Sequence, residues 1–135
     1  MAENNKRLVL VVDDESHILH VVSLKLRNAG YEVITADNGE EGFRAASEHR
    51  PDLIITDFQM PVLSGVDMCR RMKQDETLRS TPALLLTGRG FSLSPEALET
   101  TNIIAVLSKP FSPREILGRV QDVLGTKAMK GSPVL

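Results

Sequence analysis

The feature that most limits the fold of this chain is an alternation of short apolar runs with stretches of helical periodicity. Runs that are apolar at successive positions are typical of parallel strands covered by helices on both faces. Crossovers between parallel strands are right-handed, so few topologies remain. We expect five strands, which are Leu8–Val12, Tyr31–Ala36, Leu53–Thr56, Ala83–Leu86 and Ile103–Leu107.

The segments between these runs have the spacing of amphipathic helices. Ile18, Val22 and Leu26 recur at every fourth position and mark one helix face. We expect the fourth helix to be short and the segment Gly88–Pro95 before it to be mobile, because that segment is a poor helix sequence. The pattern is therefore βα repeated five times, with helices at Asp14–Asn28, from Asn38-Gly39 to about Glu48, at Gly65–Lys73, from Ser94-Pro95 to about Thr100, and from a capping box at Ser112 and Glu115 to Gly125.

Length and composition favour one soluble domain. The chain has 135 residues, of which 41% are hydrophobic and 25% charged, with a net charge of −2. Lys and Arg are interspersed with Asp and Glu, so we expect no direct nucleic acid or membrane partner. No apolar run approaches the roughly 18 residues of a membrane span. A single cysteine, Cys69, excludes an internal disulfide framework, and we expect a cytoplasmic protein.

Polar residues follow four of the expected strands. Asp13-Asp14 follows the first strand, Asp57 the third, Thr87 the fourth, and Ser108-Lys109 the fifth. The carboxyl ends of parallel strands share one edge of the sheet, where doubly wound folds bind their ligands. Three acids, a hydroxyl and an ammonium group at one edge suit a divalent metal and a phosphoryl group.

Each of these residues also has a simpler explanation. Asp13 and Asp14 could hold Mg²⁺, or Asp14 could cap the first helix. Asp57 could be a third metal ligand or a nucleophile that forms an acyl phosphate. Thr87 could be an ordinary β-branched strand residue, and Lys109 a solvated surface lysine. The Lys109-Pro110 bond could be cis, which would turn the lysine inward, or trans.

The ordered set of motifs resembles the receiver domain of bacterial two-component response regulators, including stand-alone receivers of the chemotaxis type. The resemblance runs from about Leu8 to Leu124, so we expect a receiver domain at residues 6–125 and a flexible tail at 126–135. It implies a flavodoxin-like (βα)5 three-layer sandwich whose parallel sheet has the strand order 2-1-3-4-5. The residues that carry it are Asp13-Asp14, Asp57, Met60-Pro61, Gly65, Thr87 and Lys109-Pro110-Phe111.

The resemblance also implies roles for individual residues. Asp57 would accept a phosphoryl group from a sensor histidine kinase or a phosphotransfer protein. Asp13, Asp14, Asp57 and the main-chain carbonyl of Gln59 would bind Mg²⁺. Thr87 and Lys109 would contact the phosphoryl group and relay its presence.

Three positions depart from the common receiver pattern. Val106 replaces the aromatic residue that many receivers carry three residues before the lysine. A short, stiff valine cannot swing inward, so we expect switching to act through the segment Gly88–Ser94. Gln59 and Arg89 occupy positions that flank the phosphoryl group in the family, and they could tune its hydrolysis or be ordinary exposed residues.

Several other residues are expected to have no special role. Cys69 is interpreted as a small packed side chain. His17, His20 and His49 are interpreted as surface groups, because no ligand spacing joins them to the acids. Arg70-Arg71 and Lys73 are interpreted as a solvated helix face rather than a nucleic-acid patch.

The leading hypothesis is a phosphorylation-controlled switch rather than an enzyme, with at most weak self-catalysed phosphorylation and dephosphorylation. Its output surface would comprise the fourth helix, the fifth strand and the last helix, and it would be a monomer or a phosphorylation-dependent dimer. An aspartyl-phosphate phosphatase is disfavoured because such enzymes place a second acid where Gln59 stands. A nucleotide-binding fold is disfavoured because no Gly-rich phosphate loop follows the first strand. A binding module that has lost phosphorylation is disfavoured because it would not need the intact set of acids, hydroxyl and lysine.

Overall fold

A five-stranded parallel sheet forms the centre of the molecule in the computed structural model, which describes residues 6–88 and 93–125. The strand order is β2-β1-β3-β4-β5, as the family resemblance implied. The expected tail at 126–135, Arg89 and most of the segment expected to be mobile lie outside the described residues. The strands are β1 (Leu8–Val12), β2 (Glu32–Ala36), β3 (Leu53–Asp57), β4 (Ala83–Thr87) and β5 (Ile103–Ser108).

The strand bounds differ from the predicted ones by one residue at several ends. Asp57, Thr87 and Ser108 were expected just beyond their strands, and the structure includes them as last strand residues. The chain therefore presents these polar groups directly from the sheet. In the sequence, Tyr31, Val33 and Thr35 alternate as in a strand with one buried face; Tyr31 and Val33 are buried, but Thr35 is exposed and Ala36 is buried instead.

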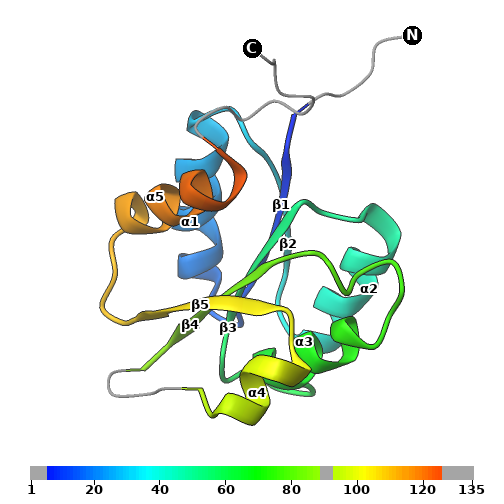
Figure 1. The fold of residues 1–135 in the computed structure, drawn as a ribbon. Coiled ribbons are helices and arrows are strands. Elements are labelled where there is room, and N and C mark those ends of the chain that lie inside the picture. The colour runs from blue at the N-terminus through cyan, green and yellow to red at the C-terminus, as the bar shows by residue number, and fades with distance from the viewer. Residues whose placement is uncertain (1–5, 89–92, 126–135) are drawn as a thin grey trace, which may run out of the picture.

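Five helices cover the two faces of the sheet (Figure 1). Helices α1 and α5 pack together on one face, and α2 and α3 lie on the other, with α4 beside α3. The three layers are those of the expected sandwich. The helices are α1 (Ser16–Asn28), α2 (Gly39–His49), α3 (Gly65–Lys73), α4 (Pro95–Thr100) and α5 (Pro113–Leu124).

Successive residues of a strand pack into two separate hydrophobic cores, one on each face of the sheet. Val9 and Val11 of β1 join the cluster beneath α1 and α5, whereas Leu10 and Val12 join the cluster beneath α2 and α3. Side chains of a strand point alternately to opposite faces, so a central strand must be apolar at every position. All four residues are fully buried, which explains the continuous apolar runs in the sequence.

The helix ends follow the predicted signals. Ser112 and Glu115 form a capping box at the start of α5, with Pro113 in the first turn, and Gly125 follows the helix with φ of 88°. Gly30, with φ of 100°, follows the C-cap of α1. Helix α4 is short, as expected, and Ser94 caps it by accepting a hydrogen bond from the N–H of Ala97.

The polar face of α3 is solvated as predicted at Arg71 and Lys73, which are exposed, but its two arginines also form ion pairs that were not predicted. Arg70 contacts Asp67 at 2.6 Å and Glu96 of α4 at 3.8 Å. Arg71 pairs with Glu40 of α2 at 2.9 Å and lies over the ring of Phe43. The two arginines therefore form ion pairs with acids on the two neighbouring helices. The periodicity of α3 alone does not reveal such contacts between helices.

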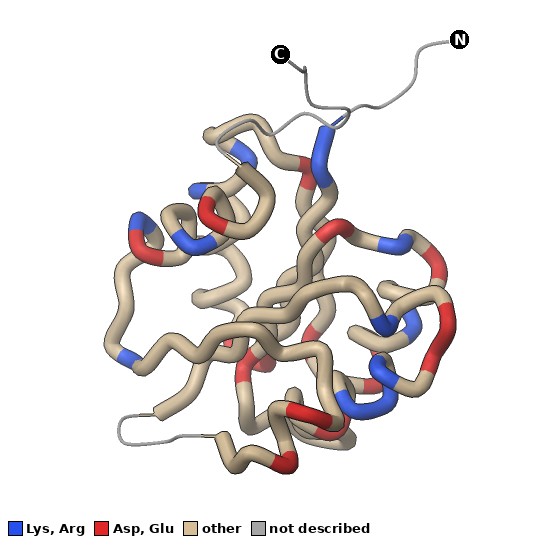
Figure 2. The backbone as a smooth tube through the Cα atoms, viewed as in Figure 1, with Lys and Arg blue, Asp and Glu red and all other residues tan. Residues whose placement is uncertain are grey.

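The remaining background predictions agree with the structure. Cys69 is buried, and burial raises the pKa of its thiol to about 12, so it is an inert packing residue. His17, His20 and His49 are exposed. Basic and acidic positions are interspersed over the molecule (Figure 2). Within the described parts of the chain, no helix has the length and apolar character needed to cross a membrane.

Candidate functional site

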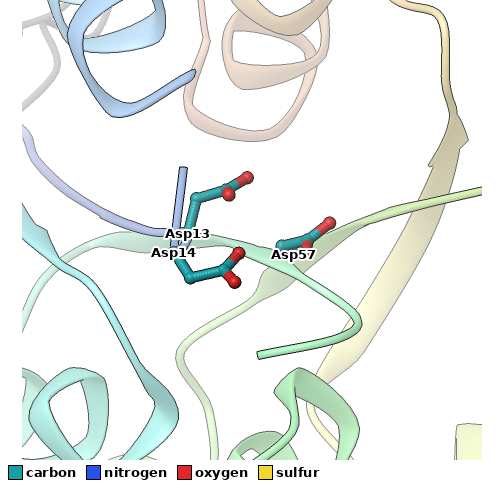
Figure 3. A group of neighbouring side chains, drawn as sticks. All are labelled: Asp13, Asp14 and Asp57. Atoms are coloured by element: carbon teal, nitrogen blue, oxygen red, sulfur yellow. The ribbon is translucent and has the colours of Figure 1, made fainter. Parts of the chain in front are cut away.

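Three carboxylates meet at the carboxyl edge of the sheet (Figure 3). Asp13 and Asp14 follow β1, and Asp57 ends the neighbouring strand β3. One oxygen from each side chain lies within 4.8 Å of the others. Asp13 is fully buried and Asp57 is 7% exposed, whereas Asp14 is exposed. Two of the three acids are therefore held in the protein interior next to a third at its surface.

Backbone contacts fix this edge. The N–H of Asp13 donates to the carbonyl of Ala36 at 3.1 Å, and the N–H of Phe58 donates to the carbonyl of Leu86 at 2.9 Å. The start of α3 also packs against Asp57, because a Cβ atom on Gly65 would collide with the Asp57 carbonyl oxygen. Glycine at position 65 therefore permits the close approach of α3 to the site.

Lys109 reaches into the acidic pocket from β5. Its N–H donates to the carbonyl of Thr87 at 2.8 Å, which fixes the backbone. The Lys109-Pro110 bond is cis, the alternative that the sequence left open. The ammonium nitrogen Nζ lies 3.0 Å from Oδ1 of Asp57 and 3.8 Å from Oε1 of Glu15. Lys109 is therefore an ion-pair partner of the site rather than a solvated lysine.

Thr87 lies beside Lys109 at the end of β4. The residue is 2% exposed, and its hydroxyl donates to the carbonyl of Gly88 at 3.2 Å. Register pairs Thr87 with Ser108 and pairs Asp57 with Leu86, so Thr87 lies one residue beyond the acid on the adjacent strand. A hydroxyl here can turn from its local carbonyl toward a group bound on Asp57.

The electrostatics of the pocket oppose full ionisation. Burial raises the pKa of Asp13 to about 6, and the charge of Asp57 acts in the same direction. Burial also raises the pKa of Asp57, although the hydrogen bond and charge of Lys109 act against this rise. Burial lowers the pKa of Lys109, but its hydrogen bond and ion pair with Asp57 prevail and leave it above its ordinary value.

The residues at this edge fit a divalent cation. Oδ1 of Asp13 accepts the N–H of Glu15 at 2.9 Å, whereas Oδ2 is buried without a hydrogen-bond partner. A buried carboxylate oxygen without a partner is costly, and a hard cation would satisfy it. Three carboxylates within 4.8 Å give the all-oxygen donor set that Mg²⁺ prefers.

The structure excludes one of the two alternatives for Asp14, and its role as a metal ligand stays a prediction. The N-cap of α1 is Glu15, so Asp14 does not cap that helix. Gln59, two residues beyond Asp57, has an exposed side chain, and its carbonyl as a metal ligand stays a prediction. Glu15 was not singled out from the sequence. Its place in the acidic run Asp13-Asp14-Glu15 was the available signal, since all three residues follow the same strand.

Comparison with known proteins agrees with this geometry. The sequence profile described as Response regulator receiver domain matches residues 9–121. The chain is 37% identical over 120 residues to the alkaline phosphatase synthesis transcriptional regulatory protein PhoP of Bacillus subtilis, a match that covers 89% of this chain and 49% of that protein. The chain thus spans about half the length of the curated relatives it matches first.

Solved structures share the whole fold. The chemotaxis response regulator CheY4 of Vibrio cholerae gives a TM-score of 0.80 at 35% identity, covering 87% of this chain and 98% of that one. The receiver domain of the sensor histidine kinase PA1611 of Pseudomonas aeruginosa has a magnesium ion coordinated in its active site cleft. It gives a TM-score of 0.78 at 29% identity, over 89% of this chain and 98% of that one.

The profile match covers most of the chain, and the same sheet order and helix arrangement recur in receivers at about one-third identity. On these grounds, this chain belongs to the response regulator receiver domain family of two-component signalling.

Proposed function

We propose that Asp57 accepts a phosphoryl group from a phosphohistidine of a sensor histidine kinase or phosphotransfer protein, in a reaction that requires Mg²⁺. The observation that carries this proposal is the position of the Asp57 carboxylate. It lies between two further acids and the ammonium group of Lys109, 3.0 Å away. That arrangement offers an acceptor oxygen with positive charge beside it, which phosphoryl transfer needs.

The transfer is a displacement at phosphorus. An oxygen of Asp57 forms the new O–P bond while the P–N bond of the donor breaks, and the donor imidazole leaves with the electron pair. Lys109 supplies positive charge to the phosphoryl oxygens, and the Thr87 hydroxyl donates to one of them. Mg²⁺, held by Asp13, Asp14, Asp57 and the carbonyl of Gln59, would neutralise negative charge on the phosphoryl group.

The ionisation of Asp57 depends on its neighbours. Burial favours the protonated acid, which is a poor nucleophile, and Lys109 at 3.0 Å favours the carboxylate. A positive partner therefore keeps the acceptor reactive in an otherwise unfavourable setting.

Phosphorylation would change the contacts of a surface made of α4, β5 and α5. Thr87 ends β4, which leads to α4, and Lys109 follows β5, which leads to α5, so both contacts of the phosphoryl group lie where this surface begins. A new negative charge at Asp57 can shift the protein between two states by its differential interaction with them. The short, stiff side chain of Val106 in β5 cannot swing inward as an aromatic residue would, so the readout would act through the segment Gly88–Ser94.

The protein would act as a switch in the cytoplasm rather than as an enzyme on separate substrates, with at most weak catalysis of its own phosphorylation and dephosphorylation. It would work as a monomer or a phosphorylation-dependent dimer. Both a stand-alone receiver and a receiver within a longer regulator fit the length comparison with its relatives.

Incubation with acetyl phosphate and Mg²⁺, followed by intact mass measurement, tests the proposal. The expected result is the mass of one added phosphoryl group, lost when Mg²⁺ is chelated before the donor is added. Asp57→Asn should remove the adduct. Asp52→Asn is the matched control at the opposite edge of the sheet and should retain it. Full labelling of Asp57→Asn would refute the assignment.

A further inference from the structure

We propose that Glu15 is a positioning residue for Lys109. The Glu15 carboxylate holds the Lys109 ammonium group at the mouth of the pocket, where a phosphoryl group on Asp57 would lie. The inference rests on the proposed function of Asp57. It adds a residue that acts on the phosphoryl group through Lys109, without contacting that group itself.

The first observation is that helix capping does not explain the side chain of Glu15. Glu15 occupies the N-cap position of α1, where Ser, Thr, Asp and Asn are favoured because their short side chains can accept a hydrogen bond from the first turn. The Glu15 side chain makes no such bond. The N-caps of α2, α3, α4 and α5 all make one, through Asn38, Ser64, Ser94 and Ser112.

The second observation is that the backbone of Glu15 is tied to the pocket. Its N–H donates to Oδ1 of Asp13 at 2.9 Å, and its carbonyl accepts the N–H of Leu19 at 3.1 Å, as the first bond of the helix. The side chain therefore starts from a fixed point beside the acids. From there its carboxylate reaches to 3.8 Å from Nζ of Lys109.

Asp57 and Glu15 differ in depth. The Asp57 side chain is 10% exposed, whereas that of Glu15 is 63% exposed, and Lys109 at 32% lies between them. The lysine ammonium is a point charge on a flexible stem, so its position is set by the anions around it. The inner anion is the acceptor itself, and the outer anion is Glu15.

This difference matters once Asp57 is phosphorylated. The carboxylate becomes an acyl phosphate and loses its negative charge, which moves outward onto the phosphoryl oxygens, so Lys109 loses its inner ion-pair partner. Glu15 remains as an anchor on the outer side and restricts the ammonium to the region that the phosphoryl oxygens enter. Exposed ion pairs have small energies, so loss of this anchor should weaken phosphoryl binding by about two- to fivefold.

The competing explanation is that Glu15 is only a negative charge near an anion site. The two explanations predict opposite signs. A positioning residue strengthens the binding of an anionic phosphoryl group, so its removal weakens binding. A bystander carboxylate repels the anion, so its removal strengthens binding.

Beryllofluoride, an analogue of the phosphoryl group, provides the probe, with Mg²⁺ at saturating concentration. Its affinity is measured for the unmodified chain, for Glu15→Gln and for Glu48→Gln. Glu48 is a matched control, because its side chain is 64% exposed and lies 3.8 Å from Nε2 of His49, at the C-terminal end of α2. In parallel, ¹³C relaxation at Cε of Lys109 reports the mobility of the ammonium end on the ps–ns timescale.

We expect Glu15→Gln to weaken beryllofluoride by about two- to fivefold and to increase the mobility of Lys109 Cε in the complex, with Glu48→Gln changing neither quantity. Unchanged or tighter binding in Glu15→Gln overturns the inference, as does unchanged Lys109 mobility. Failure of the unmodified chain to bind beryllofluoride at all would instead refute the proposed function, and the inference with it.

Discussion

Aspartates lie at both ends of the central strands, which we call the amino edge and the carboxyl edge of the sheet. The aspartate at the amino edge has hydrogen-bond and ion-pair partners within the fold, whereas those at the carboxyl edge form the candidate site. At the amino edge, Asp52 precedes β3, accepts the N–H of Leu8 at 2.8 Å through Oδ2 and lies 3.9 Å from Arg7 through Oδ1. At the carboxyl edge, Asp13 follows β1, and its Oδ2 is buried without a partner next to two further acids. Both oxygens of Asp52 have partners within the fold, whereas one oxygen of Asp13 has no hydrogen-bond partner among the residues that the structure describes.

The carboxylate at the amino edge stabilises the folded state, whereas the buried carboxylates at the carboxyl edge destabilise it when ionised. Asp52 joins the first residues of two neighbouring strands, so its bonds favour folding. Asp13 and Asp57 have pKa values raised by burial, which means that their ionised forms make the folded state less stable. A pocket that is unfavourable when empty gives a cation and a phosphoryl group a larger effect on stability when they bind.

The largest expected effect comes from neutralising the carboxyl edge. Asp13→Asn removes a proposed metal ligand while preserving the shape of the side chain, so we expect Mg²⁺-dependent phosphoryl uptake from acetyl phosphate to fall by about a hundredfold. The same change should raise the free energy of unfolding in metal-free buffer, measured by urea titration. Loss of both uptake and stability would show that Asp13 is a structural residue like Asp52.

The pH dependence of stability sharpens the contrast. The pKa of Asp13 rises from 3.8 to about 6 on folding, so protonation stabilises the folded state, and this stabilisation is lost as the pH rises from about 4 to above 6. Without Mg²⁺, the stability gained by Asp13→Asn relative to the unmodified chain should be about 3 kcal/mol at pH 7 and should shrink toward pH 4.

Urea titrations of both proteins between pH 4 and pH 7.5 measure this difference, and Mg²⁺ at pH 7 should stabilise only the unmodified chain substantially. A difference that is constant with pH would place the Asp13 carboxyl in an ordinary, solvated environment and remove the contrast between the two edges.

Removal of the amino-edge carboxylate should have the reverse profile. Asp52→Ala leaves the N–H of Leu8 without its acceptor, so we expect a loss of about 1–2 kcal/mol in the free energy of unfolding. Phosphoryl uptake from acetyl phosphate should stay within about twofold of the unmodified chain, because Asp52 lies at the edge away from the site. A large loss of uptake in the folded variant would break the separation of the two edges.

The smallest expected effect concerns the backbone after β3. Val62 has φ of 74° and is 77% exposed, and the N–H of Leu63 donates to the carbonyl of Pro61 across it at 2.8 Å. This i→i+2 hydrogen bond is that of a γ-turn, in which a β-branched residue is strained and glycine is not. Val62→Gly should therefore raise the free energy of unfolding by about 0.5–1 kcal/mol, and an unchanged or lower value would show that the turn is unstrained.

Much of the fold and the site could be predicted from the sequence because both follow from one periodic pattern. Continuous apolar runs such as Leu8–Val12 require a sheet buried on both faces, and parallel strands bring their carboxyl ends to one edge. The convergence of Asp13, Asp57 and Lys109 is a direct consequence, although they are far apart in the chain. The 2-1-3-4-5 order came from the family resemblance, since the pattern alone allows two common orders.

The features that escaped prediction depend on contacts between elements. Arg70 and Arg71 read as a solvated face within α3, but the acids that hold them belong to α4 and α2. The exposure of Thr35 follows from the position of β2 at the edge of the sheet, which relaxes the alternation. The proposed role of Glu15 depends on its ion pair with Lys109, which lies far from it in the chain.

Chemical trapping of the phosphorylated side chain identifies which carboxylate accepts the phosphoryl group. After incubation with acetyl phosphate and Mg²⁺, tritiated borohydride reduces an acyl phosphate to the corresponding alcohol, and peptide mapping locates the label. The account predicts homoserine at position 57 alone, and none when Mg²⁺ is chelated or in Lys109→Ala at the same early time point. Label at Asp13, Asp14 or any other acid, or no label at position 57 in a folded protein, would contradict it.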